Sequence, residues 1–193
     1  MKKIVCLFVC LFAGVANAGI INYGPEASFV DGGAINLNLA IDTNAETITG
    51  LSIIFQGDFG QSDEFLEVFI EGTSIGTLAP GLTSTGAFAT PTFLFGSNAN
   101  VDPMSSTAIL DLDISSFVGD GFLDVLFQAS PGVAAFAPGT QVGQGVFSGI
   151  NGFSVAVAGT IDYSSTSVPE PASLALLGLG LAGIGFSRKK KFA

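Results

Sequence analysis

Apolar and polar residues alternate along most of the centre of the chain. Between residues 35 and 41, Ile or Leu occupies every second position, and Asn36 and Asn38 lie between them. A period of two is the pattern of a strand that buries one face. Comparable patterns recur at residues 47–56, 64–71, 92–95, 107–114, 122–128 and 153–163. The pattern therefore predicts a domain built from β-strands.

Turn-forming residues separate these segments. Glu71-Gly72, Asn151-Gly152 and similar pairs supply residues that accept positive φ. No central segment keeps a helical period, and residues 133–148 have the weaker pattern of a long loop. Short strands spaced by roughly 8 to 12 residues favour an all-β fold in which two antiparallel sheets form a sandwich, jelly-roll or Ig-like in outline. We assign this sandwich to residues 19–162.

A hairpin is predicted near the middle of this domain. The Gly119-Asp120-Gly121 break lies between the alternating segments 107–114 and 122–128, which is typical of two strands joined by a tight turn. The alternation gives each side chain of the first strand a direction: Leu110, Leu112 and Ile114 inward, and Asp111 and Asp113 outward. We therefore expect the two segments to be neighbours in one sheet.

The N-terminus has the three regions of a secretory signal peptide. Lys2-Lys3 is followed by an apolar stretch and then by Ala16-Asn17-Ala18, which predicts cleavage after Ala18. A membrane span is the alternative, but an apolar stretch of about 11 residues is too short to cross a bilayer. Residues 1–18 are thus expected to export the chain. Because Cys6 and Cys10 lie in this segment, the mature domain would have no disulfide.

The C-terminus has a second set of targeting features. The residues Val168, Pro169, Glu170 and Pro171 precede an uncharged apolar run at residues 172–186. As a helix this run would be about 22 Å long, which is short for a transmembrane helix. Snorkelling of the basic residues that follow, local thinning of the bilayer, or entry of the flanking serines into the interface could close the gap. A basic cluster follows, made of Arg188, Lys189, Lys190 and Lys191, and is expected to stay on the cytoplasmic side. The Ser- and Thr-rich residues 163–168 have the composition of a linker.

This order of short motif, apolar span and basic cluster resembles the PEP-CTERM sorting signal of Gram-negative bacteria, here at residues 169–191. The resemblance implies processing by an exosortase, a membrane-embedded transpeptidase, after the chain has been anchored in the inner membrane by the C-terminal helix. It further implies release to the cell surface or the extracellular matrix, and an association with exopolysaccharide and biofilm. An ordinary tail anchor with a chance Pro-Glu-Pro is the alternative.

Charge is the most unusual feature of the central domain. All six basic residues lie in the two targeting segments, whereas 15 of the 16 acidic residues lie between residues 19 and 168. Binding to nucleic acid depends on Lys and Arg, so a nucleic-acid partner is not expected. Self-repulsion of the carboxylates favours the uptake of counterions. Alternatively, the carboxylates are a solvated surface that keeps the protein soluble.

The residues available for catalysis are few. The mature domain lacks His, Lys and Cys, which usually activate a nucleophile or bind catalytic zinc. An acid pair, such as Asp63 with Glu67 or Asp120 with Asp124, could serve a glycoside hydrolase. Fifteen acids produce such pairs by chance, and the domain has no Trp or Arg for sugar binding. We therefore expect a protein that is not an enzyme, with an acid-pair hydrolase as the third interpretation.

The second interpretation is a binding module that depends on calcium or carbohydrate. Carboxylates suit calcium, and the candidate ligands are Asp111, Asp113, Asp120 and Asp124. The segment is not an EF-hand loop, because Ser116 and Phe122 replace the glycine and the bidentate glutamate. Outward Asp residues that discourage edge-to-edge pairing would explain Asp111 and Asp113 equally well.

A loop between two predicted strands offers a sugar site. Its polar candidates are Gln56, Asp58, Gln61, Asp63 and Glu64. Phe59 in the same loop would supply the aromatic platform on which a sugar ring stacks.

Overall fold

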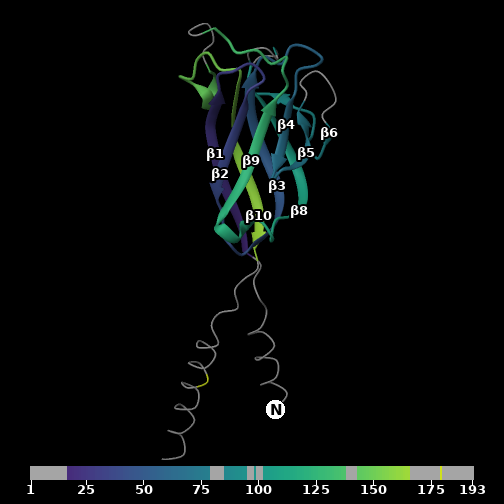
Figure 1. Cartoon of the computed structure of the whole chain (residues 1–193), viewed down its shortest axis with the longest axis vertical. Coiled ribbons are helices and arrows are strands. Elements are labelled where there is room, and N and C mark those ends of the chain that lie inside the picture. Colours follow the sequence, from purple (N-terminus) through teal and green to yellow (C-terminus); the bar gives the residue numbers. More distant parts are fainter. Residues whose placement is uncertain are drawn as a thin grey trace, which may run out of the picture. The chain divides into compact units, whose positions relative to one another are not determined.

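The computed structural model describes residues 17–78, 85–94, 98, 102–137, 143–165 and 179. The chain divides into one unit at Ala18–Ser165 and another that comprises Met1–Asn17 and Thr166–Ala193. The described part of the first unit consists of β-strands and two short 3-10 helices, η1 (Val118–Asp120) and η2 (Gly145–Phe147) (Figure 1). The prediction of an all-β domain is confirmed.

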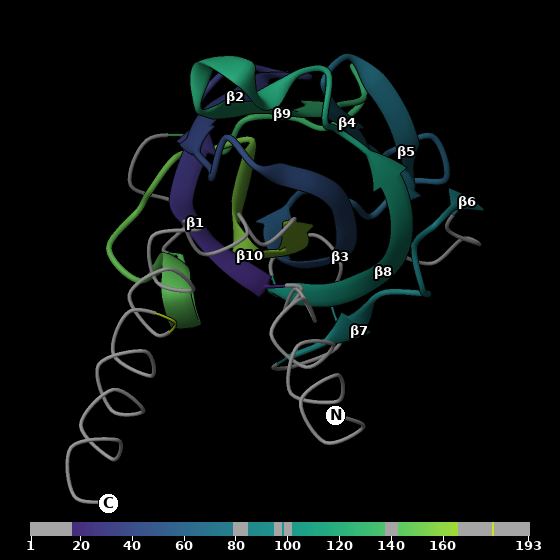
Figure 2. The ribbon, with the colours of Figure 1, turned by 90° about the horizontal axis from the view of Figure 1, so that it is seen from below.

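The strands form two antiparallel sheets. In spatial order, the first sheet contains β1 (Asn17–Ser28), β10 (Val155–Ser165), β3 (Ala45–Gly57), β8 (Met104–Asp113) and β7 (Thr92–Phe93). The second sheet contains β2 (Ala34–Ala40), β9 (Phe122–Ala129), β4 (Leu66–Ile70), β5 (Thr73–Leu78) and β6 (Thr85–Gly86). Figure 2 shows the two sheets facing each other, so the arrangement is sandwich-like.

Three pairs of neighbouring strands join the beginning of the domain to its end. β1 lies beside β10, β2 pairs with β9, and β3 pairs with β8, whereas β4 pairs with the next strand, β5. Neighbours in a sheet are therefore often far apart in the sequence. In particular, the β2–β9 register places Asn38 opposite Asp124 and Asn36 opposite Leu126.

The main core lies between the sheets and is built from alternate residues of each strand. On β3, for example, Leu51, Ile53 and Phe55 are buried. The largest fully buried side chains of the described chain are phenylalanines: Phe55, Phe59, Phe127, Phe147 and Phe153. Outward residues of β8 follow the same alternation, because Asp111 and Asp113 are exposed while Leu110 and Leu112 pack against the core. These side-chain directions were predicted correctly.

A second, smaller core covers the outer face of the first sheet. Ala156 and Ala158 point away from the main core, because they alternate on β10 with Val155 and Val157. Phe147 and Phe153, which lie outside the strands, pack on these alanines. The described part of the expected loop at residues 133–148 contains η2 and no strand, and it contributes Phe136 and Phe147 to this core.

The predicted hairpin between residues 107–114 and 122–128 is wrong. Strand β8 belongs to the first sheet and β9 to the second, so the chain crosses from one sheet to the other between them. Ile114 and Val118 explain the crossing, because both are fully buried in the main core. Burying these two side chains draws the connection across the end of the sandwich, and the turn closes with the Gly121 amide donating to the Val118 carbonyl at 2.9 Å.

The boundaries of the domain also differ from the prediction. Tyr163, Ser164 and Ser165, which we expected in the linker, are the last residues of β10. Tyr163 packs against the main core and Ser165 is buried, so this end of the strand has contacts that a linker lacks. At the other end, β1 begins at Asn17 and thus includes Ala18, the last residue of the predicted signal peptide.

Candidate functional site

The outer face of the second sheet carries both polar and apolar side chains. On β9, Leu123, Val125 and Phe127 are buried, so the residues between them point outward. These outward residues are Phe122, Asp124, Leu126 and Gln128. Because β9 lies between β2 and β4, its outward side chains form the middle of the face.

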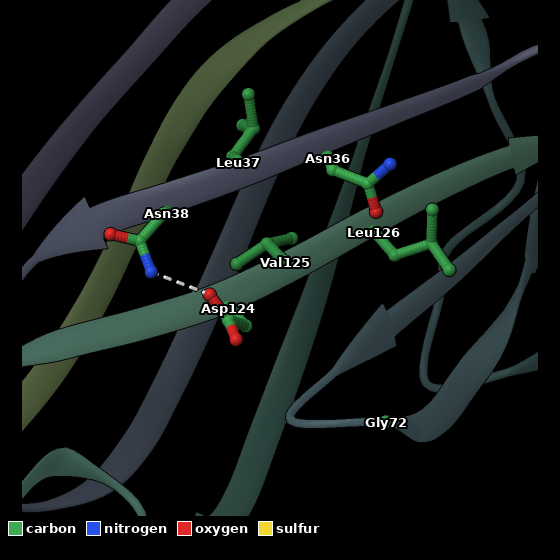
Figure 3. Close-up of a pocket in the computed structure, with 7 residues that line it drawn as sticks. All are labelled: Asn36, Leu37, Asn38, Gly72, Asp124, Val125 and Leu126. Carbon is green, nitrogen blue, oxygen red and sulfur yellow. Dashed lines mark hydrogen bonds between the residues drawn. The ribbon is translucent and has the colours of Figure 1, made fainter.

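Two amides of β2 lie beside this row. Asn36 and Asn38 are exposed, since Ile35 is buried and Leu37 packs against the main core. The Nδ2 of Asn38 donates a hydrogen bond of 2.7 Å to Oδ1 of Asp124, and Figure 3 shows the two side chains turned toward each other. This bond fixes the direction in which both groups present their remaining polar atoms.

The turn between β4 and β5 lies beside the same part of β9. Its two residues, Glu71 and Gly72, both have positive φ, 50° and 72°. Positive φ is unfavourable for Glu, but Glu71 is held on both sides: its amide donates to the Asp124 carbonyl at 2.9 Å, and its Oε1 accepts from the Asp124 amide at 2.8 Å. The turn is thereby fastened to β9 at the residue that also bonds Asn38.

A shallow hollow of about 330 Å³ lies at this place. Its lining is drawn in Figure 3 and consists of Asn36, Leu37, Asn38, Gly72, Asp124, Val125 and Leu126. No atom of the described chain lies within 4 Å of where a side chain at Gly72 would begin, so the hollow is open on that side. Amide and carboxylate groups thus surround a partly apolar floor.

The rest of this face is polar and hydrogen-bonded. Ser74 on β5 donates to Glu67 on β4 at 2.8 Å, and the hydroxyls of Thr77 and Thr85 are 2.7 Å apart. These bonds continue the polar surface across the sheet from the hollow toward the β6 edge. Sequence reasoning did not assign Asn36 and Asn38 to any site, although it predicted that both point outward.

The four residues predicted to bind calcium do not come together. Asp111 and Asp113 lie on β8 in the first sheet, Asp124 lies on β9 in the second sheet, and Asp120 lies in η1 between them. Asp113 and Asp120 instead form local hydrogen bonds at the two ends of the connection between β8 and β9. Asp113 accepts hydrogen bonds from the hydroxyl and the amide of Ser115, which lower the pKa of Asp113, and Asp120 accepts from the Phe122 amide at 3.0 Å. Among the described residues, no group of three or more acidic, His or Cys side chains could hold a metal ion.

The predicted sugar site in the loop after β3 is also not formed. Phe59 is buried and packs edge-to-face against Phe55, with ring centres 5.4 Å apart, so no sugar could stack on it. Gln56 is buried as well, and its Oε1 accepts from the Gln144 amide at 3.1 Å. Phe59 was wrongly assigned to a surface site because its neighbours in the sequence are polar, whereas its ring is buried in the core.

Glu64 in that loop is the most buried carboxylate of the described domain, with 4% of its surface exposed. Burial raises its pKa, the hydrogen bond from the Gln61 amide opposes this, and the nearby charges of Asp58 and Asp63 raise the pKa further. Glu64 is therefore harder to ionise than an ordinary glutamate. It belongs to a loop and not to the hollow on the second sheet.

The predicted targeting residues lie outside the described part of the chain. These are Ala16 of the signal peptide, the motif Val168, Pro169, Glu170 and Pro171, and the basic cluster from Arg188 to Lys191. Within the residues that are described, no helix is long and apolar enough to cross a membrane.

The described structure defines a two-sheet, sandwich-like β domain whose last strand ends at Ser165. A family model described as the PEP-CTERM protein-sorting motif matches residues 167–189, directly after this strand. The chain therefore carries a PEP-CTERM sorting domain at its C-terminal end, as the sequence predicted. A search among curated proteins finds no match to the chain.

Proposed function

We propose that this protein is exported, sorted through its C-terminal motif and displayed at the cell surface or in the extracellular matrix, where it acts without catalysing a reaction. The observation that carries the proposal is the PEP-CTERM match at residues 167–189. Processing there by an exosortase-type transpeptidase would follow anchoring in the inner membrane. An association with exopolysaccharide and biofilm is part of the proposal through the same motif.

The N-terminal residues support the export step. Lys2-Lys3, the apolar stretch and the Ala16-Asn17-Ala18 sequence have the order that a signal peptidase requires. Removal of both targeting segments would leave a domain without a Lys, Arg or His side chain. Such a domain, which also has no Cys, lacks the side chains that most often activate a nucleophile, and this supports a role in binding or structure.

The strand order supports a particular sandwich. In the domain β1 lies beside β10, β2 beside β9, β3 beside β8, and β4 beside β5. We infer that the fold is a jelly roll, because folding one long antiparallel ribbon over itself produces this order. Jelly rolls serve many functions, so the support for the proposed role comes from the motif and not from the fold.

Cell fractionation tests the sorting role. Replacing Pro169, Glu170 and Pro171 together by alanine should retain the protein with the membranes, because the processing enzyme no longer recognises it. Thr166→Ala, just before the matched residues, is the control and should reach the surface or medium like the natural sequence. Equal release of the triple variant and of the control would contradict sorting through this motif.

A further inference from the structure

We propose that the hollow between β2, β9 and the β4–β5 turn binds an uncharged sugar unit of a polysaccharide or oligosaccharide. The proposal rests on the side chains of this one face and is independent of the route by which the protein is sorted. Its central observation is the array of two amides and one carboxylate around an apolar floor (Figure 3).

The polar atoms of the hollow match those of a polyol. A sugar hydroxyl both donates and accepts hydrogen bonds, and an amide side chain offers both functions in one group. Asn38 donates one amide hydrogen to Asp124, and this bond fixes the orientation of the Asn38 carbonyl oxygen. The side chain of Asn36, whose backbone pairs with Leu126, makes no hydrogen bond within the described chain. Asp124 adds an acceptor of high strength, because hydrogen bonds to ionised groups are stronger than neutral ones.

The apolar part of the hollow suits the ring of a sugar. Leu126 forms the floor between Asn36 and the β4 residue Phe69, which the register places on its other side. Phe122 lies two residues before Asp124 on the same face of β9, and 44% of its surface is exposed. An exposed aromatic ring next to the hollow gives an adjoining sugar unit a surface to stack on.

Charge selects among ligands of this kind. The chain has no Lys, Arg or His between residues 19 and 168, and Glu71 lies beside the hollow, bonded to the backbone of Asp124. A phosphate, sulfate or uronic acid would be repelled here, since nothing on the domain offsets its charge. The hollow is also near the small end of ligand pockets, which measure about 300 to 1,000 Å³. An uncharged sugar unit meets both conditions.

Affinity electrophoresis of the full chain in a non-ionic detergent tests the proposal. Native gels are cast with a neutral β-glucan, a mannan or a xylan, and a further gel with polygalacturonate as the anionic counterpart. We expect one or more of the neutral polysaccharides to retard the protein, and polygalacturonate to leave its mobility unchanged. Retardation in no neutral gel, or in polygalacturonate alone, would overturn the proposal.

Variants assign the binding to this face. Asn36→Ala and Asn38→Ala should each weaken binding about fivefold to tenfold, since each removes hydrogen bonds to the sugar. Thr107→Ala, an exposed position on β8 in the other sheet, should bind like the natural sequence. Thermal melting of all variants must give one midpoint to within a few degrees, so that unfolding is not mistaken for lost binding.

Two results would contradict a sugar site in the hollow. If all three variants bind the neutral polysaccharide equally, the site lies elsewhere. If sedimentation shows self-association that Asn36→Ala or Asn38→Ala abolishes, the face is an interface between copies of this chain. Either result overturns the assignment of a sugar site to the hollow.

Discussion

At the scale of single residues, Tyr23 reaches its place because Gly159 has no side chain. The Tyr23 ring stacks on Phe127 with centres 5.6 Å apart, and its hydroxyl donates to the Ser52 carbonyl at 3.1 Å. A side chain at Gly159 would begin 2.6 Å from that hydroxyl and would also collide with the Ser52 carbonyl. Burial raises the pKa of Tyr23, so the phenol stays protonated and continues to donate.

Removing this hydroxyl should destabilise the sandwich modestly. Tyr23→Phe leaves the Ser52 carbonyl without its buried donor, and we expect a loss of about 1 kcal/mol in the free energy of unfolding. Tyr163→Phe is the matched control, because the Tyr163 hydroxyl has no hydrogen-bond partner in the described chain. Urea denaturation followed by fluorescence or circular dichroism measures both. An equal effect of the two substitutions would contradict the role of the Tyr23 hydrogen bond.

Glu64 should make stability depend on pH. Because its pKa is raised in the folded state, the folded protein holds the Glu64 proton more tightly than the unfolded chain does. The resulting stabilisation is complete below the unfolded value of about 4.3, and it is lost as pH rises through the folded pKa. Glu64→Gln should therefore flatten this part of the pH profile of unfolding.

The control for Glu64→Gln is Glu26→Gln, which removes the same charge at an exposed site on β1. Unfolding midpoints measured from pH 4 upward should show the smaller slope only for Glu64→Gln. A parallel shift of both profiles would mean that total charge, and not the burial of Glu64, governs this part of the curve.

At the scale of elements, the second, smaller core on the outer face of the first sheet is separate from the main core. Phe153 packs edge-to-face on Phe136 with ring centres 6.0 Å apart and lies on the alanines of β10. Phe147→Ala should destabilise the domain by about 3 kcal/mol, since truncation of a buried Phe leaves a cavity. Val146→Ala, at the exposed neighbouring position, should change stability by less than about 0.5 kcal/mol.

Hydrogen exchange tests whether the second core unfolds separately from the sandwich. In Phe147→Ala, amides at residues 143–150 should lose protection first, whereas those of β3 and β9 should retain it until global unfolding. Simultaneous loss of protection in the second core and in these strands would show that the second core is not an independent unit.

The strands themselves were largely predictable, whereas their partners were not. The pattern predicted β2, β3, β4, β7, β8, β9 and β10, and most of these bury one face along their length. It missed β1, where Gly24 and Pro25 interrupt the pattern next to a targeting signal, and β5, where Gly76 does the same. Pairing depends on contacts between distant segments, which local patterns do not contain.

The candidate site was unpredictable for the same reason. The sequence predicted that Asn36 and Asn38 point outward, but Asn38 and its partner Asp124 are 86 residues apart. Only the pairing of β2 with β9 brings them together. Conversely, Asp111, Asp113, Asp120 and Asp124 are close in the sequence, and the crossing between the sheets separates the first pair from Asp124. Proximity along the chain was therefore a poor guide to proximity in space.

At the scale of the whole molecule, repulsion between the carboxylates lowers the stability of the domain. Fifteen acidic residues and no side-chain cation lie between residues 19 and 168, so salt should stabilise the fold by screening. The thermal midpoint should rise with NaCl concentration at pH 7. The rise should disappear near pH 3, where most carboxylates are protonated.

A comparison of salts distinguishes screening from specific binding. Calcium chloride and sodium chloride at equal ionic strength should give similar midpoints if the carboxylates act as a diffuse charge. A much larger stabilisation by calcium, reversed by a chelator, would contradict this and would indicate a specific calcium site.

The central claim is that the chain is sorted and cut at its C-terminal motif, which C-terminal mass spectrometry of the protein from a producing cell tests directly. We predict a mature end close to Pro169, within or beside the motif matched at residues 167–189. An intact end at Ala193 on the protein recovered from the surface or the medium would contradict the claim.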